Sequence, residues 1–168
     1  VPIDHPCLEQ ARKRGQKVIS EIELAYLLTQ VPIIAVTGTN GKTTTVHLIK
    51  EILSEGGKRV VLSGNVGYPL SQAIRELSED TEPDYLVTEI SSFQLEGIEH
   101  FRPCIAAILN ITPDHLDRHP DFSSYVRLKS RVFLNQGLQD FAVLNYDDPV
   151  LKNISANILS KKLFFSRS

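Results

Sequence analysis

The sequence predicts an α/β protein with three layers, in which a mostly parallel sheet carries helices on both of its faces. Two observations lead to this prediction. Short β-branched runs alternate along the chain with longer segments of helical period. Most of these runs are continuously apolar rather than alternating, which is typical of strands that are buried on both faces.

Each expected element follows from its local pattern. The strands are the β-branched and aromatic runs, in chain order Lys17–Ser20, Ile33–Thr37, Arg59–Ser63, Tyr85–Ile90, Cys104–Asn110, Phe141–Asn145 and Lys162–Ser166. The helices are the stretches of helical period, in chain order Cys7–Arg14, Ile22–Leu28, Thr44–Glu55, Leu70–Leu77, Ser123–Asn135 and Val150–Ile154. The break at Gln30-Val31-Pro32 indicates that the segment before it closes a preceding domain.

Composition and charge exclude several classes of protein. The chain has 168 residues, of which 42% are hydrophobic and 23% charged, as in an ordinary globular domain. Its formal net charge of -2 gives no reason to expect nucleic acid or an anionic membrane as a partner. No apolar run approaches the length of a membrane span, and no signal pattern opens the chain. Cys7 and Cys104 lie too far apart for a metal motif, so we expect two packing residues in a cytoplasmic protein.

Polar residues follow the expected strands where a parallel sheet gathers its ligands, at the carboxyl ends. They form the segments Thr37–Thr43, Gly64–Asn65, Glu89–Ser92, Asn110–His119 and Asn145–Asp148. Because parallel strands end at one edge of the sheet, we expect the functional site to lie along this edge.

The run VTGTNGKTTT, Val36–Thr45, ends in the Gly-Lys-Thr that closes a phosphate-binding loop. The standard loop, G-x-x-x-x-G-K-S/T, needs a glycine where this chain has Val36, and the nearest earlier glycine is Gly38. Glycines let N–H groups turn toward an anion, and the following helix adds its positive N-terminus. We interpret the run as a phosphate loop of a distinct type, and the alternative is a tight turn in which Asn40-Gly41 supplies a positive φ.

Glu89 closes the apolar run YLVT, where a carboxylate in a phosphate-loop sheet usually holds Mg²⁺. The alternative is an acid that caps the next turn. Ser91 and Ser92 follow, and they either bind a ligand or cap the segment SFQLEGIE. In NITPDHLDRH, Asn110–His119, His115 is either a ligand or a residue of a solvated turn.

Lys129 lies on the apolar side of its expected helix, with Tyr125 one turn before it and Phe133 one turn after it. The spacing favours a lysine whose stem is buried and whose ammonium reaches water. The functional alternative is a lysine whose lowered pKa suits chemistry or modification. SGNVGYP, Ser63–Pro69, reads as a plain turn, and LNYDDP, Leu144–Pro149, reads as a strand end with an aspartate cap.

Taken together, these stretches resemble the Mur ligases, the ATP-dependent amino-acid-adding enzymes of peptidoglycan and hence cell-wall synthesis. TGTNGKTT resembles the family's shortened phosphate loop, NITPDHLDRH its magnesium and substrate segment, and YVRLKSRVF its lysine helix. TEISSFQLE resembles the signature of the member that adds D-glutamate. The resemblance covers the whole chain and implies the P-loop NTPase-like fold of the family's central domain.

The resemblance also implies roles for single residues. ATP would be held by the loop residues Gly38, Thr39, Asn40, Gly41, Lys42, Thr43 and Thr44. Thr43 and Glu89 would ligate a first Mg²⁺, and His115 a second. Lys129 would be the family's carbamylated lysine, whose new carboxylate helps to bind the second ion. Catalysis would thus rest on Lys42, Glu89, His115 and Lys129, whereas Asn65, Ser91 and His115 would contact the substrate.

The implied reaction joins D-glutamate to UDP-N-acetylmuramoyl-L-alanine through an acyl phosphate, in a full-length enzyme that is a monomer. By this resemblance residues 1–20 would be a remnant of the N-terminal UDP-binding domain and residues 21–168 a partial central ATP-binding domain. The chain also has no methionine and opens on VPIDHP. We therefore expect an excised piece without the C-terminal domain, inactive alone, although a processed protein would look the same.

Other functions stay open. Folylpolyglutamate synthases share GTNGK, so the loop alone indicates only the superfamily, and another Mur ligase or a folate-adding enzyme is the first alternative. A nucleotide-binding module that does no ligation is the second, and it predicts nothing unusual at Lys129. A domain that only binds other proteins is the third, and on this interpretation the polar residues at the strand ends would be there by coincidence.

Overall fold

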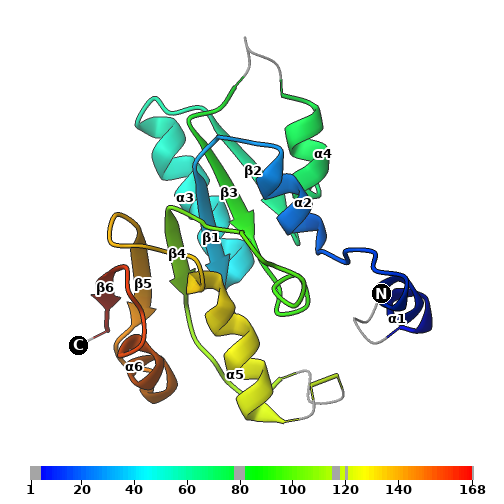
Figure 1. The fold of residues 1–168 in the computed structure, drawn as a ribbon. Coiled ribbons are helices and arrows are strands. Elements are labelled where there is room, and N and C mark those ends of the chain that lie inside the picture. The colour runs from blue at the N-terminus through cyan, green and yellow to red at the C-terminus, as the bar shows by residue number, and fades with distance from the viewer. Residues whose placement is uncertain (1–4, 78–81, 115–117, 120, 168) are drawn as a thin grey trace.

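The computed structural model describes residues 5–77, 82–114, 118–119 and 121–167. One parallel sheet of six strands runs through the molecule in the order β2-β3-β1-β4-β5-β6 (Figure 1). Its strands are β1 (Ile33–Thr37), β2 (Val60–Gly64), β3 (Tyr85–Glu89), β4 (Ile105–Ile108), β5 (Phe141–Asn145) and β6 (Lys161–Phe165). The predicted fold class is confirmed.

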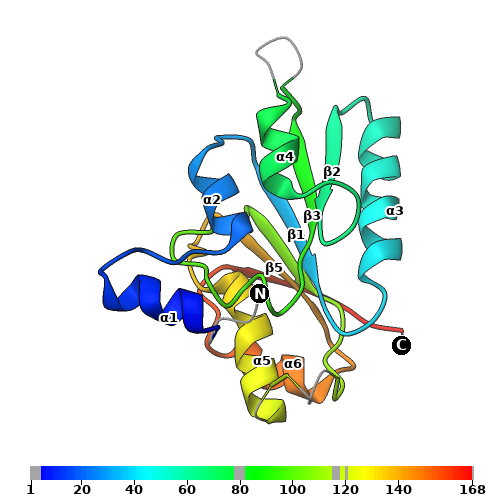
Figure 2. The same cartoon turned by 90° about the vertical axis from the view of Figure 1, so that its right-hand side faces the viewer.

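Helices cover both faces of the sheet (Figure 2). They are α1 (Pro6–Lys13), α2 (Glu21–Leu27), α3 (Lys42–Glu55), α4 (Leu70–Arg75), α5 (Phe122–Ser130), the 3-10 turn η2 (Arg131–Phe133) and α6 (Pro149–Ser155). On one face α3 packs Val46 against Ile34 and Val87 of the strands. On the other face α2, α4, α5 and α6 contribute Ile22, Leu70, Tyr125 and Leu151 to a larger core. Among the described helices, none is long and apolar enough to cross a membrane.

The order of the strands decides what lies beside the phosphate loop. β1 is flanked by β3 and β4, so that Val36 pairs with Glu89 on one side and with Ala107 on the other. The connections between neighbouring strands therefore cross over, and segments far apart in sequence meet at the carboxyl edge. Two of these segments, the exits of β3 and β4, flank residues 38–41.

Aspartate caps set the start of the two helices that follow β4 and β5. Asp121 accepts a hydrogen bond from the Ser124 N–H at 2.6 Å, and Asp148 accepts one from the Val150 N–H at 2.9 Å. Each carboxylate satisfies an N–H group that has no partner within the helix. The helix expected at Ser123–Asn135 begins at Phe122, and its α-helical part ends at Ser130, where the 3-10 turn η2 follows.

The strand expected at Lys17–Ser20 is wrong, because this segment contains no strand. The Ser20 N–H donates to the Gly97 carbonyl at 2.9 Å, which is a contact with a loop and not part of a ladder. Ser20 then precedes α2 as its N-cap residue. The expectation of double-sided burial also fails at β6, where every residue is exposed because the strand lies at the edge of the described sheet.

Candidate active site

The phosphate loop spans the short gap between β1 and α3. Strand β1 runs to Thr37, and Gly41 is the N-cap of α3 with a φ of 85°. Gly38 has a φ of 145°, and a Cβ atom on it would lie 3.2 Å from the Leu109 Cβ. Both glycines are therefore required by the backbone. The N-cap Gly41 has no side chain with which to cap the first N–H groups of α3, and the positive end of the helix can therefore attract an anion.

Lys42 folds back over this loop. Its Nζ donates to the carbonyl oxygens of Gly38 at 3.0 Å and of Thr39 at 2.9 Å. The ammonium therefore lies above the backbone turn at the N-terminus of α3, and the two positive features reinforce each other. This position is the one from which a lysine can reach the outer phosphates of a nucleotide.

Glu89, the last residue of β3, connects this strand to α3 and to the exit of β2. The Thr43 hydroxyl donates to its Oε2 at 2.7 Å, and the Asn65 side-chain amide donates to its Oε1 at 2.9 Å. The Asn65 N–H also donates to the Glu89 carbonyl oxygen at 2.9 Å. Glu89 is only 2% exposed, so these donors replace the water that an exposed carboxylate would hold. The Glu89 carboxylate does not cap the turn that follows it, because its side-chain partners come from α3 and from the β2 exit.

The segment SGNVGYP is more than a plain turn. Gly64 has a φ of 103°, and a Cβ on it would lie 2.3 Å from the Glu89 carbonyl oxygen. Glycine is therefore needed for the backbone of β2 to approach Glu89, and this approach brings the Asn65 side chain to the carboxylate. The signal in the sequence is the glycine directly after the expected strand, a pattern that is also typical of a plain turn.

Lys129 does not reach water, so the interpretation of a lysine with a solvated ammonium is wrong. The residue is 2% exposed, and its Nζ donates to the Gly38 carbonyl oxygen at 2.9 Å. The ammonium lies 4.6 Å from the centre of the Tyr125 ring. Burial, with a further contribution from the positive charge of Lys42, lowers the pKa of Lys129 to about 7, and Asp114 opposes this shift. A large fraction of the amine is therefore neutral near pH 7.

Ser91 and Ser92 have different partners. The Ser91 N–H and hydroxyl both contact the Gln94 Oε1, at 2.9 and 3.0 Å, so that Ser91 closes the turn after β3. Ser92 Oγ lies 3.1 Å from the His119 Nε2, and His119 stacks on Phe93 with ring centres 5.2 Å apart. His119 is buried, with 3% of its surface exposed.

These residues surround a cavity of about 260 Å³. It is lined by Thr39, Lys42, Asn65, Ser91, Ser92, Phe93, Asp114, Tyr125 and Lys129. The structure thus brings Lys42, Asn65, Ser91 and Lys129 to one cavity, with Glu89 bonded to Asn65 beneath it. His115 lies outside the described residues. Tyr125 and Asp114 were not among the predicted site residues, although Tyr125 stands one helical turn before Lys129.

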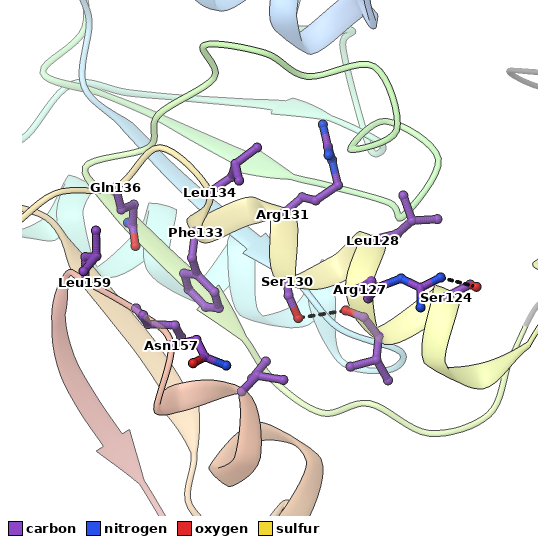
Figure 3. A pocket seen from close by; sticks show the side chains of 13 residues that line it. Ser124, Arg127, Leu128, Ser130, Arg131, Phe133, Leu134, Gln136, Asn157 and Leu159 are labelled. Atoms are coloured by element: carbon purple, nitrogen blue, oxygen red, sulfur yellow. Dashed lines mark hydrogen bonds between the residues drawn. The ribbon is translucent and has the colours of Figure 1, made fainter.

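A larger cleft of about 800 Å³ lies elsewhere, between α5–η2 and the segment from α6 to β6 (Figure 3). Phe133, Leu134, Ile154 and Leu159 give it an apolar lining. The polar side chains of α5 in this cleft bond within their own helix, as Ser130 does to the Val126 carbonyl oxygen at 2.8 Å. The cleft contains no predicted site residue, and the convergent polar groups mark the smaller cavity as the candidate active site.

Comparison with known proteins identifies the family of this chain. Residues 36–168 match the family model described as the Mur ligase middle domain. The chain is 50% identical over 167 residues to a UDP-N-acetylmuramoylalanine--D-glutamate ligase of Alkaliphilus oremlandii, and 53% identical over 167 residues to one of Koribacter versatilis. In both cases the match covers 99% of this chain and 36% of the relative, so the chain spans about a third of the relatives' length.

Solved structures agree at the level of the fold. The MurF ligase of Thermotoga maritima in complex with ADP superposes with a TM-score of 0.69 at 21% identity, covering 88% of this chain and 36% of that one. Escherichia coli FolC in complex with ADP gives 0.58 at 17% identity, covering 96% and 51%. Because likeness at such identities shows the fold alone, membership rests on the family model and the sequence relatives. This chain belongs to the Mur ligase family, and residues 36–168 match its middle domain.

Proposed function

We propose that the protein is an ATP-dependent ligase of peptidoglycan precursor synthesis that adds D-glutamate to UDP-N-acetylmuramoyl-L-alanine in the cytoplasm. One observation carries the proposal: Lys129 is buried at 2% exposure and donates to the Gly38 carbonyl oxygen of the phosphate loop. A module that only binds nucleotide has no need of a second, buried amine beside the loop. The names of the relatives supply the substrates, and both substrates therefore remain part of the proposal.

The chemistry of the side chains fits a magnesium nucleotide. Thr43 and Glu89 place a hydroxyl and a carboxylate oxygen 2.7 Å apart, and these are oxygen ligands of the kind that Mg²⁺ prefers. Among the described residues no cluster of three His, Cys, Asp or Glu side chains is present, so phosphate oxygens and water would complete the coordination. Thr43 and Glu89 would hold the ion, and its positive charge would help to neutralise the charge of the phosphate groups.

Lys129 fits carbamylation. A pKa of about 7 leaves much of the amine neutral, and a neutral amine adds to CO₂, forms a C–N bond and releases one proton. The product carries a carboxylate in place of an ammonium, within reach of the positive Lys42. We propose that this carboxylate and His115, which lies outside the described residues, would hold a second Mg²⁺.

The remaining residues position the substrates. The ammonium of Lys42 and the N-terminus of α3 bind the phosphates of ATP and stabilise the charge on the phosphoryl group as it moves to the carboxylate of UDP-N-acetylmuramoyl-L-alanine. Asn65 and Ser91 orient that carboxylate from the β2 and β3 exits. The amine of D-glutamate then attacks the acyl phosphate, and inorganic phosphate leaves as the amide forms.

The test is phosphate release by the protein from the complete natural gene, supplied with Mg-ATP and UDP-N-acetylmuramoyl-L-alanine. D-Glutamate is compared with L-glutamate, L-lysine and meso-diaminopimelate, and release with D-glutamate alone is expected. Lys129→Ala is expected to abolish release, while Lys50→Ala, which removes a partly exposed lysine of α3, should leave it unchanged. Release with another amino acid refutes the substrate, and no release with any amino acid refutes ligation.

A further inference from the structure

The phosphate loop of this chain is short, and Lys42 supports it from within through the Gly38 and Thr39 carbonyl oxygens. Val36, which stands where a standard loop has its first glycine, is fully buried in β1 and pairs with strands on both sides. Only residues 38–40 separate the end of β1 from the N-cap Gly41. A loop this short has few backbone groups with which to brace itself.

The exit of β4 supplies the missing contacts through Asn110. Its side-chain oxygen accepts from the Asn40 N–H at 2.9 Å, and its side-chain N–H₂ donates to the Asn40 carbonyl at 3.0 Å. Its own carbonyl accepts from the Thr39 N–H at 2.9 Å. One residue thus binds both backbone groups of Asn40, in the manner of a neighbouring strand.

Two further sets of hydrogen bonds support the segment around Asn110. Thr112, two residues further along the chain, donates its N–H to the Thr39 hydroxyl at 3.0 Å, and that hydroxyl donates to the Thr112 carbonyl at 3.1 Å. Behind it, the Ile111 N–H donates to Asp148 at 2.8 Å, and the Asn145 side chain donates to the Leu109 carbonyl at 3.2 Å. The exit of β5 therefore braces the exit of β4, which in turn braces the loop.

We propose that Asn110 is a positioning residue that imposes the phosphate-binding shape on residues 38–41 from outside the loop. It holds the backbone of Asn40 and so directs the N–H groups of Gly41 and Lys42 toward the position of the phosphates. In a longer loop the backbone can hold its own phosphate-binding conformation. In this shortened loop Asn110 at the exit of β4 holds that conformation instead. This inference rests on the proposed function for its ligand, a magnesium nucleotide.

Asn135 offers a matched control. Its side-chain N–H₂ also bridges backbone carbonyls, those of Glu99 at 2.9 Å and Phe101 at 3.0 Å, but it does so at the opposite end of β4. Asn110→Ala and Asn135→Ala therefore both remove an amide that holds a neighbouring segment. Only Asn110→Ala removes hydrogen bonds to the phosphate loop.

The experiment uses the protein from the complete natural gene and measures Mg-ADP affinity by calorimetry and amide hydrogen exchange without nucleotide. Asn110→Ala is expected to weaken Mg-ADP binding by about tenfold and to speed exchange in residues 38–43, and Asn135→Ala to change neither. Asn110→Asp keeps the size and the acceptor toward the Asn40 N–H but loses the donor, and weaker binding is expected here too.

The outcomes separate the two proposals. If the unaltered protein fails to bind Mg-ADP, the proposed function is wrong, while the exchange measurement still decides whether Asn110 shapes the loop. If Asn110→Ala and Asn110→Asp bind within twofold of the unaltered protein and exchange is unchanged, Asn110 has no positioning role. Equal losses in Asn110→Ala and Asn135→Ala would also overturn the inference, because they would reflect general destabilisation.

Discussion

The buried amine of Lys129 makes folding stability depend on pH in a calculable way. Its pKa falls from the ordinary value of 10.5 to about 7 in the folded protein, because burial disfavours the charged form. The unfolded chain therefore binds one more proton than the folded chain between these two values. Stability is greatest above pH 10.5 and is lost as the pH falls toward 7, at about 1.4 kcal/mol per pH unit.

Between pH 7 and pH 9 the contribution of Lys129 to the free energy of unfolding changes by about 2 kcal/mol, after allowance for the half-protonated amine at pH 7. Urea unfolding would be measured at pH 6, 7, 8 and 9, in buffers freed of CO₂ so that the amine stays unmodified. The free energy of unfolding of Lys129→Met is subtracted from that of the unaltered protein at each pH, which removes the contribution of every other titrating group.

The difference should rise by about 2 kcal/mol from pH 7 to pH 9 and change little below pH 6. Lys50→Met serves as the matched control for this subtraction, because the Lys50 side chain is 40% exposed. A flat difference for Lys129 would mean that the ammonium keeps its ordinary pKa inside the protein. That result would remove the physical basis for a neutral amine at this position, and with it the argument for carbamylation.

Two further predictions concern the Glu89 carboxylate and the glycine beside it. Glu89→Gln keeps one acceptor for Thr43 but removes the charge, so we expect phosphate release by the full-length enzyme to require about tenfold to a hundredfold more Mg²⁺, measured by titration of the rate. An unchanged magnesium dependence would contradict the assignment. Gly64→Ala should cost about 2–5 kcal/mol in urea unfolding, from the positive φ together with the 2.3 Å approach to the Glu89 carbonyl. Gly57→Ala shares the positive φ but has open space around it, so its cost should stay near 1–2 kcal/mol, and equal costs would show that the approach can relax.

Local patterns were sufficient for most of the fold. The apolar run before the glycines and the helical period after them placed β1 and α3 within two residues of their observed bounds. The expected strand at Lys17–Ser20 failed because a β-branched run becomes a strand only beside a partner, and this segment meets a loop at Gly97.

The site was predictable as a set of strand ends but not as a set of contacts. Sequence spacing put Lys129 on an apolar helix face, yet whether its ammonium reaches water depends on the distant Gly38 carbonyl. The role of Asn110 was hidden for the same reason. It depends on β4 lying next to β1, and the order of strands in a crossover sheet is a property of the whole chain.

The carbonyl oxygen of Gly38 accepts hydrogen bonds from the side-chain amines of two lysines. Lys42 approaches it at 3.0 Å and Lys129 at 2.9 Å, so one lone-pair region serves two ammonium groups that repel each other. An anion that draws Lys42 outward leaves this oxygen to Lys129 and lessens the repulsion on it. The charge of Lys129 therefore depends on what occupies the phosphate loop. The Gly38 carbonyl oxygen couples the binding of an anion in this loop to the protonation state of Lys129.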